Sequence, residues 1–313
     1  MFFYIFIPSV IIFLIILFFA VTFVCFRMTF YAPKKRKNSS LPVGGKFEQY
    51  KDLISGWADK TAAIPYEDVY VKSFDGLTLH GKFYEYQKGA PIEIMFHGYR
   101  GTVERDLCGG VLRCFKLKRS ALLVDQRASG KSDGNVITFG VKERYDCAFW
   151  AEYAYNRFGD KVKLFLTGIS MGAATVLMAS SMPLPKTVVG VVADCGYSTP
   201  KDIIKLTVKK MKLPPTLFYA FIKLGAKIYG KFNLEEFSPV EAMKSSRLPV
   251  LFIHGDEDNF VPAKMSYINY DACTTKKRIL IVKGASHGMS YPVNQDEYIK
   301  AVNDFYTTNP ELN

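Results

Sequence analysis

The sequence predicts an α/β protein with a mostly parallel, doubly wound sheet of about eight strands. Short apolar runs alternate with longer segments of helical periodicity between residues 92 and 282, as in successive βαβ units. Two β-rich runs before residue 92 predict a hairpin that joins this sheet. An uncharged apolar run at residues 1–26 predicts one further helix outside the sheet.

The apolar run is long enough to cross a bilayer, because about 20 apolar residues span the hydrocarbon core. A cleaved signal peptide is the alternative, but no basic residue precedes the run and residues 25–28 are a poor cleavage site. The bases that follow the run are Arg27, Lys34, Lys35, Arg36 and Lys37. Basic residues stay on the cytoplasmic side, so we expect a single-pass membrane protein with its folded domain in the cytoplasm.

Composition divides the chain into three expected parts. Residues 1–27 form a transmembrane anchor, residues 28–65 a juxtamembrane linker with a lead-in helix, and residues 66–313 the folded domain. The six cysteines show no framework spacing and no CxxC pair, which suits free thiols in a reducing compartment.

The elements of the folded domain follow from the pattern of apolar runs and turn residues. Asp75-Gly76 separates the two strands of the hairpin, at residues 68–73 and 77–86. The expected later strands are residues 92–96, 121–124, 162–166, 188–193, 250–253 and 279–282. The expected helices between them are residues 104–116, 141–158 and 171–181.

Residues 197–246 interrupt this alternation and predict a helical cap inserted between two strands. Pro214-Pro215 divides the segment, and residues 201–231 carry eight lysines against one aspartate. Its apolar stripe consists of Leu217, Phe218, Phe221, Ile222, Leu224 and Ile228. The stripe either lies on a membrane surface or packs on a pocket beneath the cap, and the second interpretation is favoured.

The net charge of +12 is concentrated in two places. The first 37 residues contribute +5 and residues 201–231 contribute +7, so the rest of the chain is neutral. A basic protein often binds nucleic acid, but charge confined to a membrane flank and one segment favours a membrane surface as partner.

Residues 168–172 read Gly-Ile-Ser-Met-Gly and lie between an expected strand and an expected helix. This is the nucleophile-elbow pattern in the context that it requires, because a strained turn there lifts the serine hydroxyl above the sheet. We therefore expect Ser170 to be a nucleophile rather than a helix-capping serine.

A serine nucleophile needs a histidine base and a carboxylate that orients it. His287 follows the last strand and is the expected base. The other three histidines are assigned structural roles: His80 as a half-buried strand residue, and His97 and His254 at strand ends.

Asp258 is the preferred acid because it follows a strand and precedes the turn at Val261-Pro262, which leaves it facing the sheet edge. Asp256, which is expected to order the turn, and Asp194 remain alternatives. The oxyanion hole is expected to use the backbone N–H groups of Met171, next to the nucleophile, and Tyr99, in the Gly-rich loop after residue 96.

These motifs together resemble the α/β-hydrolase superfamily. The matching segments are residues 97–98, 125–132, 168–172, 254–262 and 286–288. The chain is most similar to bacterial esterase-like and serine-aminopeptidase-like members. The resemblance implies the α/β-hydrolase fold, a structural role for Asp125 and Arg127, and a variable cap at residues 197–246.

The leading functional prediction is hydrolysis of a carboxylic ester through an acyl-enzyme on Ser170. A peptidase that trims short peptides is the alternative, and a non-catalytic membrane binding protein is a third, less favoured by the complete set of motifs. The expected substrate is a small acyl ester or a short peptide. No cofactor or metal is expected, because the histidines lie at separate strand ends without ligand spacing.

Overall fold

The computed structural model describes residues 2–33 and 45–307. The bases expected to flank the membrane helix at residues 34–37 lie outside the described residues, whereas Arg27 lies within them.

One eight-stranded sheet forms the centre of the domain, in the order β1-β2-β4-β3-β5-β6-β7-β8. The strands are β1 (Glu67–Lys72), β2 (Thr78–Tyr84), β3 (Ile92–Phe96), β4 (Ser120–Val124), β5 (Leu164–Ile169), β6 (Val188–Asp194), β7 (Val250–Gly255) and β8 (Lys277–Val282). β2 pairs antiparallel with β1 and β4, and every later pairing is parallel. The predicted hairpin followed by a doubly wound parallel sheet is therefore confirmed.

The central strands are continuous apolar runs because helices cover both faces of the sheet. Successive side chains alternate between the faces. On β5, Leu166 packs on the face covered by α5 and α6, whereas Phe165 packs on the opposite face with residues of α12. All five residues of β3 are buried.

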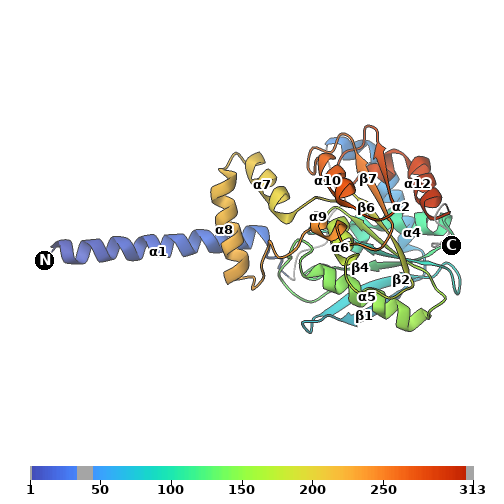
Figure 1. Ribbon diagram of the computed structural model, residues 1–313, viewed down its shortest axis with the longest axis horizontal. Helices are drawn as coiled ribbons and strands as arrows, with labels where there is room; N and C mark the ends of the chain where they lie inside the picture. Colours follow the sequence, from blue (N-terminus) through green and yellow to red (C-terminus); the bar gives the residue numbers. More distant parts are fainter. Residues whose placement is uncertain (1, 34–44, 308–313) are drawn as a thin grey trace.

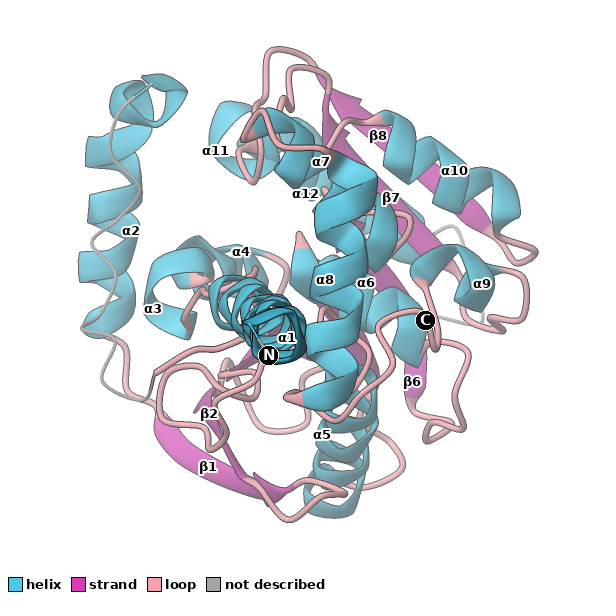
Figure 2. Cartoon of the chain, turned by 90° about the vertical axis from the view of Figure 1, so that its left-hand side faces the viewer, coloured by secondary structure: helices cyan, strands magenta, loops and turns pink. Residues whose placement is uncertain are grey.

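The helices cover the sheet or, in the case of the N-terminal helix and the helices within residues 200–228, lie to one side of it, as Figures 1 and 2 show. They are α1 (Phe2–Thr29), α2 (Lys51–Ala62), α3 (Val103–Asp106), α4 (Cys108–Lys116), α5 (Glu143–Phe158), α6 (Met171–Ala179), α7 (Pro200–Lys210), α8 (Pro215–Ile228), α9 (Pro239–Met243), α10 (Lys264–Ala272), α11 (Ser290–Val293) and α12 (Gln295–Thr307). A 3₁₀ helix, Gly45–Tyr50, precedes α2, so the expected lead-in helix begins as a tighter turn.

The helix expected at residues 104–116 is divided in two. Thr102 caps α3 by accepting the N–H of Arg105, and Leu107 then leaves helical geometry with φ −116° and ψ 3°. At this break the carboxylate of Asp106 accepts the N–H of Gly98, which ties α3 to the loop after β3.

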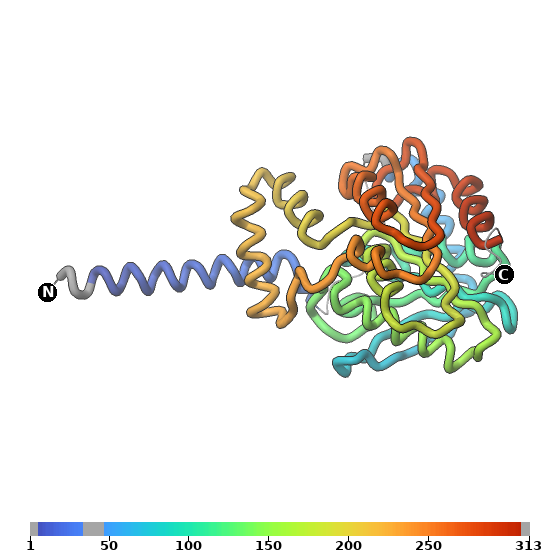
Figure 3. The backbone as a smooth tube through the Cα atoms, viewed as in Figure 1, coloured from blue at the N-terminus to red at the C-terminus, as the bar shows by residue number. Residues whose placement is uncertain are grey.

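Within the described residues, α1 alone is long and apolar enough to cross a membrane. Its N-terminal half projects away from the domain, where the side chains of residues 6–15 are exposed, and its C-terminal end packs against α8 (Figures 1 and 3). A Cβ at Gly225 of α8 would lie 2.9 Å from both Phe26 Cβ and the Thr22 carbonyl oxygen, so glycine lets the two helices approach closely.

The residues that follow α1 belong to the core of the domain. Phe30 is fully buried, and its ring meets those of Phe139 and Phe232 edge-on. The carbonyl of Phe30 accepts the N–H of Ile137 at 2.8 Å. The structure thus packs residues 30–32, which composition assigns to the linker, into the folded domain.

Candidate active site

Ser170 occupies a strained turn between β5 and α6, with φ 56° and ψ −113°. Two close approaches make this turn possible. A Cβ at Gly168 would overlap the backbone of Gly172, and a Cβ at Gly172 would overlap the carbonyl of Phe96 on β3. Glycine is therefore required at both positions, and the serine hydroxyl is held above the sheet edge.

A hydrogen-bonded relay joins three of the predicted site residues. Ser170 Oγ lies 2.9 Å from His287 Nε2, and His287 Nδ1 lies 2.7 Å from Asp258 Oδ2. His287 comes from the loop after β8 and Asp258 from the loop after β7, and the parallel strands bring both loops to the same edge as Ser170. With the serine hydroxyl donating to Nε2 and the Nδ1–H donating to Asp258, this is the order that serine catalysis needs.

Asp258 is surrounded by donors. Its Oδ1 accepts the N–H groups of Phe260 and Val261, each at 2.8 Å, and its Oδ2 lies 3.2 Å from His254 Nε2. Burial alone raises the pKa of this carboxyl, but its hydrogen bonds with His254 and His287 outweigh burial. The pKa of Asp258 therefore lies well below its usual range, and the carboxylate stays ionised.

The two alternative acids have other partners. Asp194 Oδ1 accepts the hydroxyl of Ser290 at 2.9 Å, and Asp256 Oδ1 accepts the N–H of Gly284 at 2.6 Å. Burial raises the pKa of Asp194 to about 6, and the Ser290 hydrogen bond opposes this only in part. The geometry at Nδ1 of His287 therefore favours Asp258, and Asp256 orders the turn as expected.

The two predicted oxyanion-hole residues border Ser170. Met171 is the first residue of α6, where backbone N–H groups lack an intrahelical partner. Tyr99 and Ser170 line a common cavity, and a Cβ at Gly98 would lie 3.6 Å from Ser170 Cβ. The Tyr99 hydroxyl donates to the Thr29 carbonyl at 2.7 Å, so the end of α1 helps to hold this loop in place.

His254 was assigned only a structural role, and its contact with Asp258 was missed. Its Nδ1 lies 2.6 Å from Ser266 Oγ and its Nε2 2.8 Å from the Val261 carbonyl, so the ring is fixed on both sides. The separation of only four residues between His254, at the end of a strand, and Asp258, in the loop that follows, is the sequence feature that could have predicted this contact.

The expectation for His80 was wrong in degree. His80 is fully buried rather than half-buried, between Asp125 Oδ2 at 2.8 Å and Asp68 Oδ1 at 2.6 Å. Asp125 also accepts the N–H of Lys131, and Arg127 donates to Asp146 at 2.7 Å. These contacts give Asp125 and Arg127 the loop-ordering role that the resemblance implied.

Among residues 2–33 and 45–307, one set of side chains offers possible metal ligands. Cys195 Sγ lies with ligand atoms of Asp258 and His287 in a group whose members are within 4.8 Å of one another. Burial raises the pKa of the Cys195 thiol far above its usual value, so the thiol stays protonated. A protonated thiol is a poor ligand, and Asp258 and His287 are bound to each other, so this set fits the serine relay better than a metal.

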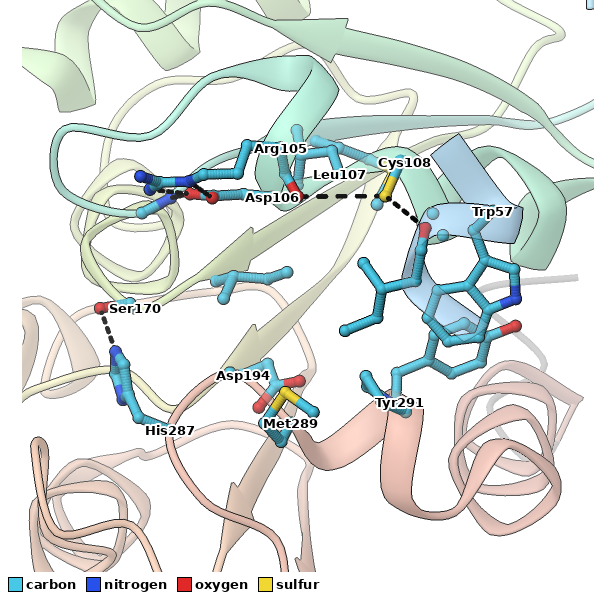
Figure 4. Close-up of a pocket in the computed structure, with 18 of the residues that line it drawn as sticks. Trp57, Arg105, Asp106, Leu107, Cys108, Ser170, Asp194, His287, Met289 and Tyr291 are labelled. Atoms are coloured by element: carbon cyan, nitrogen blue, oxygen red, sulfur yellow. Dashed lines mark hydrogen bonds and ion pairs between the residues drawn. The ribbon is translucent and has the colours of Figure 1, made fainter. Parts of the chain in front are cut away.

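Two cavities meet at Ser170. The histidine-side cavity, of about 340 Å³, runs from Ser170 and His287 past Asp194 to the stacked rings of Trp57 and Tyr291 (Figure 4). Trp57 lies on α2, so the lead-in helix closes the far end of this cavity. No local pattern predicts this contact, because Trp57 and Tyr291 are far apart in the chain.

The cap-side cavity, of about 610 Å³, lies between α1, α7 and α8. The α1 side chains that line it are Ala20, Val21, Val24, Cys25, Met28 and Thr29. The α7 and α8 side chains that line it are Ile203, Ile204, Thr207, Val208, Phe218 and Ile222. Part of the apolar stripe of the cap therefore faces a cavity beside Ser170, in agreement with the favoured interpretation that the stripe packs on a pocket. Another member of the stripe, Phe221, contacts the ring of Phe18 on α1.

The sheet, the elbow and the loops at its edge define an α/β hydrolase. Residues 138–311, more than half of the chain, match the prolyl oligopeptidase family, and the chain belongs to that family. It is therefore a hydrolase.

Two relatives and one solved structure are similar to the chain. The chain is similar to YqkD of Bacillus subtilis, with 25% identity over 187 residues, which are 59% of this chain and 61% of YqkD. The match thus spans less than two thirds of YqkD. The chain is also 25% identical to protein bem46 of Schizosaccharomyces pombe, over 79% of this chain and 78% of that protein. The structure of esterase Pf2001 of Pyrococcus furiosus shares the fold, with a TM-score of 0.65 and 23% identity over 87% of this chain and 98% of the esterase.

Proposed function

We propose that the chain is a membrane-anchored serine hydrolase that cleaves a carboxylic ester. The observation that carries the proposal is the continuous relay from Ser170 through His287 to an ionised Asp258, with the serine in a strained elbow. Such a relay activates a hydroxyl that is otherwise a weak nucleophile.

In the first half of the reaction, Ser170 Oγ attacks the ester carbonyl while His287 Nε2 takes the hydroxyl proton. The negative charge that develops on the carbonyl oxygen is stabilised by the N–H groups of Met171 and Tyr99. Asp258 holds the imidazole in position and stabilises its positive charge. When the tetrahedral intermediate collapses, His287 gives the proton to the leaving alcohol, and the acyl group remains on Ser170.

In the second half, His287 Nε2 takes a proton from water, and the resulting hydroxide attacks the acyl-enzyme. Collapse of the second tetrahedral intermediate returns the proton to Ser170 and releases the carboxylic acid. Water is the second substrate, and Ser170, His287, Asp258 and the N–H groups of Met171 and Tyr99 perform the other roles in both halves.

A peptidase is the second candidate, because the matched family is the prolyl oligopeptidase family. The histidine-side cavity contains two carboxylates, Asp106 and Asp194, which could hold a substrate amine. Asp106 is already paired with Arg105, however, and Asp194 with Ser290. The apolar cap-side cavity beside Ser170 suits an acyl chain, so an ester is preferred.

The nucleophile is tested with an active-site fluorophosphonate on the full chain in detergent. We expect the wild type to be labelled and Ser170→Ala to remain unlabelled. Ser181→Ala, just beyond the end of the same helix, is the matched control and should label normally. Labelling that persists in Ser170→Ala would contradict the assignment. A panel of p-nitrophenyl esters and aminoacyl-anilides then separates an esterase from a peptidase.

We further propose that α1 is retained as an anchor rather than cleaved as a signal sequence. Cys25, Phe26 and Phe30 are buried in the hydrolase core, and removal of α1 would expose their partners. Burial of the two phenylalanine side chains stabilises the fold by roughly 1.5 to 3 kcal/mol each. The mass of the mature protein should therefore include residue 1, and a mature N-terminus beyond residue 25 would refute retention.

The proposed arrangement has the hydrolase domain, from residue 66 onward, on the cytoplasmic side. The basic residues after α1 and six buried, unpaired cysteines support this side. In intact cells, an epitope added at the C-terminus should resist protease supplied outside the cell. The protease should digest it only after the membrane has been permeabilised. Digestion from the outer face would reverse the orientation.

A further inference from the structure

The two cavities at Ser170 differ in their relation to the histidine. His287 lines only the histidine-side cavity and Met171 only the cap-side cavity, whereas Ser170 and Tyr99 line both. Since the histidine must deliver a proton to the leaving oxygen, the leaving alcohol has to lie on the His287 side of the serine. The acyl group, whose carbonyl oxygen points to the N–H groups of Tyr99 and Met171, then extends into the cap-side cavity.

The cap-side cavity is suited to an apolar chain. Its volume of about 610 Å³ is large enough for one ligand of moderate size. Although residues 201–231 carry eight lysines, the side chains that α7 and α8 present to the cavity are those of isoleucine, valine, phenylalanine and one threonine. Several lysines point elsewhere: Lys201 and Lys223 pair with Glu235, and Lys210 donates to the Phe260 carbonyl.

The cavity is also open along apolar side chains. Val24 and Met28 on α1 and Met211 after α7 line it, yet they are 52%, 59% and 51% exposed. Exposed apolar side chains around an opening are typical of a surface that meets a membrane or another apolar partner.

The position of this opening along α1 matches the edge of a bilayer. A helix rises about 1.5 Å per residue, so about 20 residues cover the roughly 30 Å of the hydrocarbon core. The segment that is apolar and long enough to span the bilayer is Phe6–Thr29, and the α1 side chains that line the cavity, from Ala20 to Thr29, belong to its C-terminal end, so the opening lies at one edge of the bilayer. Figures 1 and 2 show α8 beside α1 and running across its axis, so α8 lies along the membrane surface when α1 spans the bilayer.

We infer that the substrate is a bilayer-resident ester of a single long acyl chain with a small polar alcohol. The acyl chain enters the cap-side cavity from the membrane between α1 and the cap, and the alcohol occupies the histidine-side cavity. This inference rests on the proposed esterase activity and on the retained anchor. Ser170 attacks the ester carbonyl where the two cavities meet.

The inference is tested with the full chain in lipid nanodiscs and p-nitrophenyl esters of 4 to 12 acyl carbons. Each methylene that enters an apolar cavity improves binding, so kcat/KM should rise at least about tenfold from the shortest to the longest ester. Val24→Trp places a large ring at the opening and should abolish the rise in kcat/KM with acyl-chain length.

Leu17→Trp is the matched control. Leu17 lies seven residues before Val24, which is two turns along the same face of α1, and it is outside the cavity. It should leave the chain-length dependence unchanged. A flat dependence in the wild type, or equal loss for all esters in Val24→Trp, would overturn the inference. Those results leave the proposed function intact. That function would be refuted if the wild type showed neither fluorophosphonate labelling nor hydrolysis of any ester.

A second measurement distinguishes substrate in the bilayer from substrate in water. Monopalmitoylglycerol is supplied in the nanodiscs, and its mole fraction in the bilayer is lowered about fivefold by adding ether-linked phosphatidylcholine. The bulk concentration of monopalmitoylglycerol is kept constant. Entry from the bilayer predicts a rate that falls in proportion to the mole fraction of substrate in the nanodisc. A rate that follows only the bulk concentration would show that the substrate arrives from water, and would overturn the membrane route.

Discussion

The ends of β6 and β7 each carry a buried aspartate, and the environments of these two carboxylates are opposite. Asp258 after β7 accepts two backbone N–H groups and lies between two histidines, whereas Asp194 at the end of β6 accepts one hydroxyl. The pKa of Asp258 is therefore far below its usual range, while burial raises the pKa of Asp194 to about 6.

Position at the sheet edge does not determine the role of either group. Both aspartates are almost completely buried, and each lies close enough to His287 for the charge of the imidazole to lower the pKa of the carboxyl group. The number of donors around each carboxylate decides which one stays ionised beside the imidazole. The difference predicts separate effects of replacing each aspartate.

The largest expected effect is on catalysis and comes from Asp258→Asn. The amide cannot hold His287 in the tautomer that accepts the serine proton, so kcat should fall by about 10³- to 10⁴-fold. Hydrolysis of a short p-nitrophenyl ester measures the loss. Asp256→Asn, two residues away and bonded only to the turn at Gly284, should lose less than about threefold. Similar losses in the two variants would remove the distinction between them.

Asp194→Asn should act mainly on stability and its pH dependence. The pKa of Asp194 is raised from 3.8 to about 6, so the folded state holds this proton more tightly than the unfolded state does. The contribution to stability is complete below about pH 4 and is lost as pH rises to about 6. Between about pH 4 and pH 6, the unfolding free energy of the wild type should fall by up to about 3 kcal/mol. The variant should not show this fall, because it has no carboxyl group at this position.

Urea unfolding of both proteins at pH 4, 5, 6 and 8 measures this difference. The variant should match the wild type at pH 4 and exceed it at pH 8, and its kcat should fall by less than about tenfold because the relay is intact. A higher unfolding free energy for the wild type than for the variant at pH 8 would show that the ionised carboxylate of Asp194 stabilises the fold. That result would contradict the contrast drawn between Asp194 and Asp258.

Local patterns predicted the sheet and the relay because each depends on few residues. The run Gly168 to Gly172 determines its own turn, and the loops after β7 and β8 need only the parallel sheet to meet. The ranking of Asp258 above Asp194 followed from triad order, but their opposite environments depend on donors such as His254 and Ser290. Those contacts require folded geometry.

The region around α1 was beyond prediction for the same reason. Composition identified residues 1–26 as uncharged and almost wholly apolar, and nothing in that composition distinguishes the exposed residues 6–15 from the end that packs against α8. The close approach at Gly225 joins residues about 200 positions apart. Local periodicity carries no information on such a contact.

The smallest expected effect is that of Ser290→Ala, which removes the one hydroxyl that Asp194 accepts. This hydrogen bond stabilises the ionised carboxylate, so its loss should raise the pKa of Asp194 further. A hydrogen bond to a charged group contributes about 1.5 to 3 kcal/mol, against about 1 kcal/mol for a neutral pair. The variant should therefore be destabilised by about 1 kcal/mol more at pH 8 than at pH 4. In an Asp194→Asn background this pH-dependent part should vanish, because no carboxylate remains to ionise. A pH-dependent part that survives there would assign the effect to another group and weaken the contrast between Asp194 and Asp258.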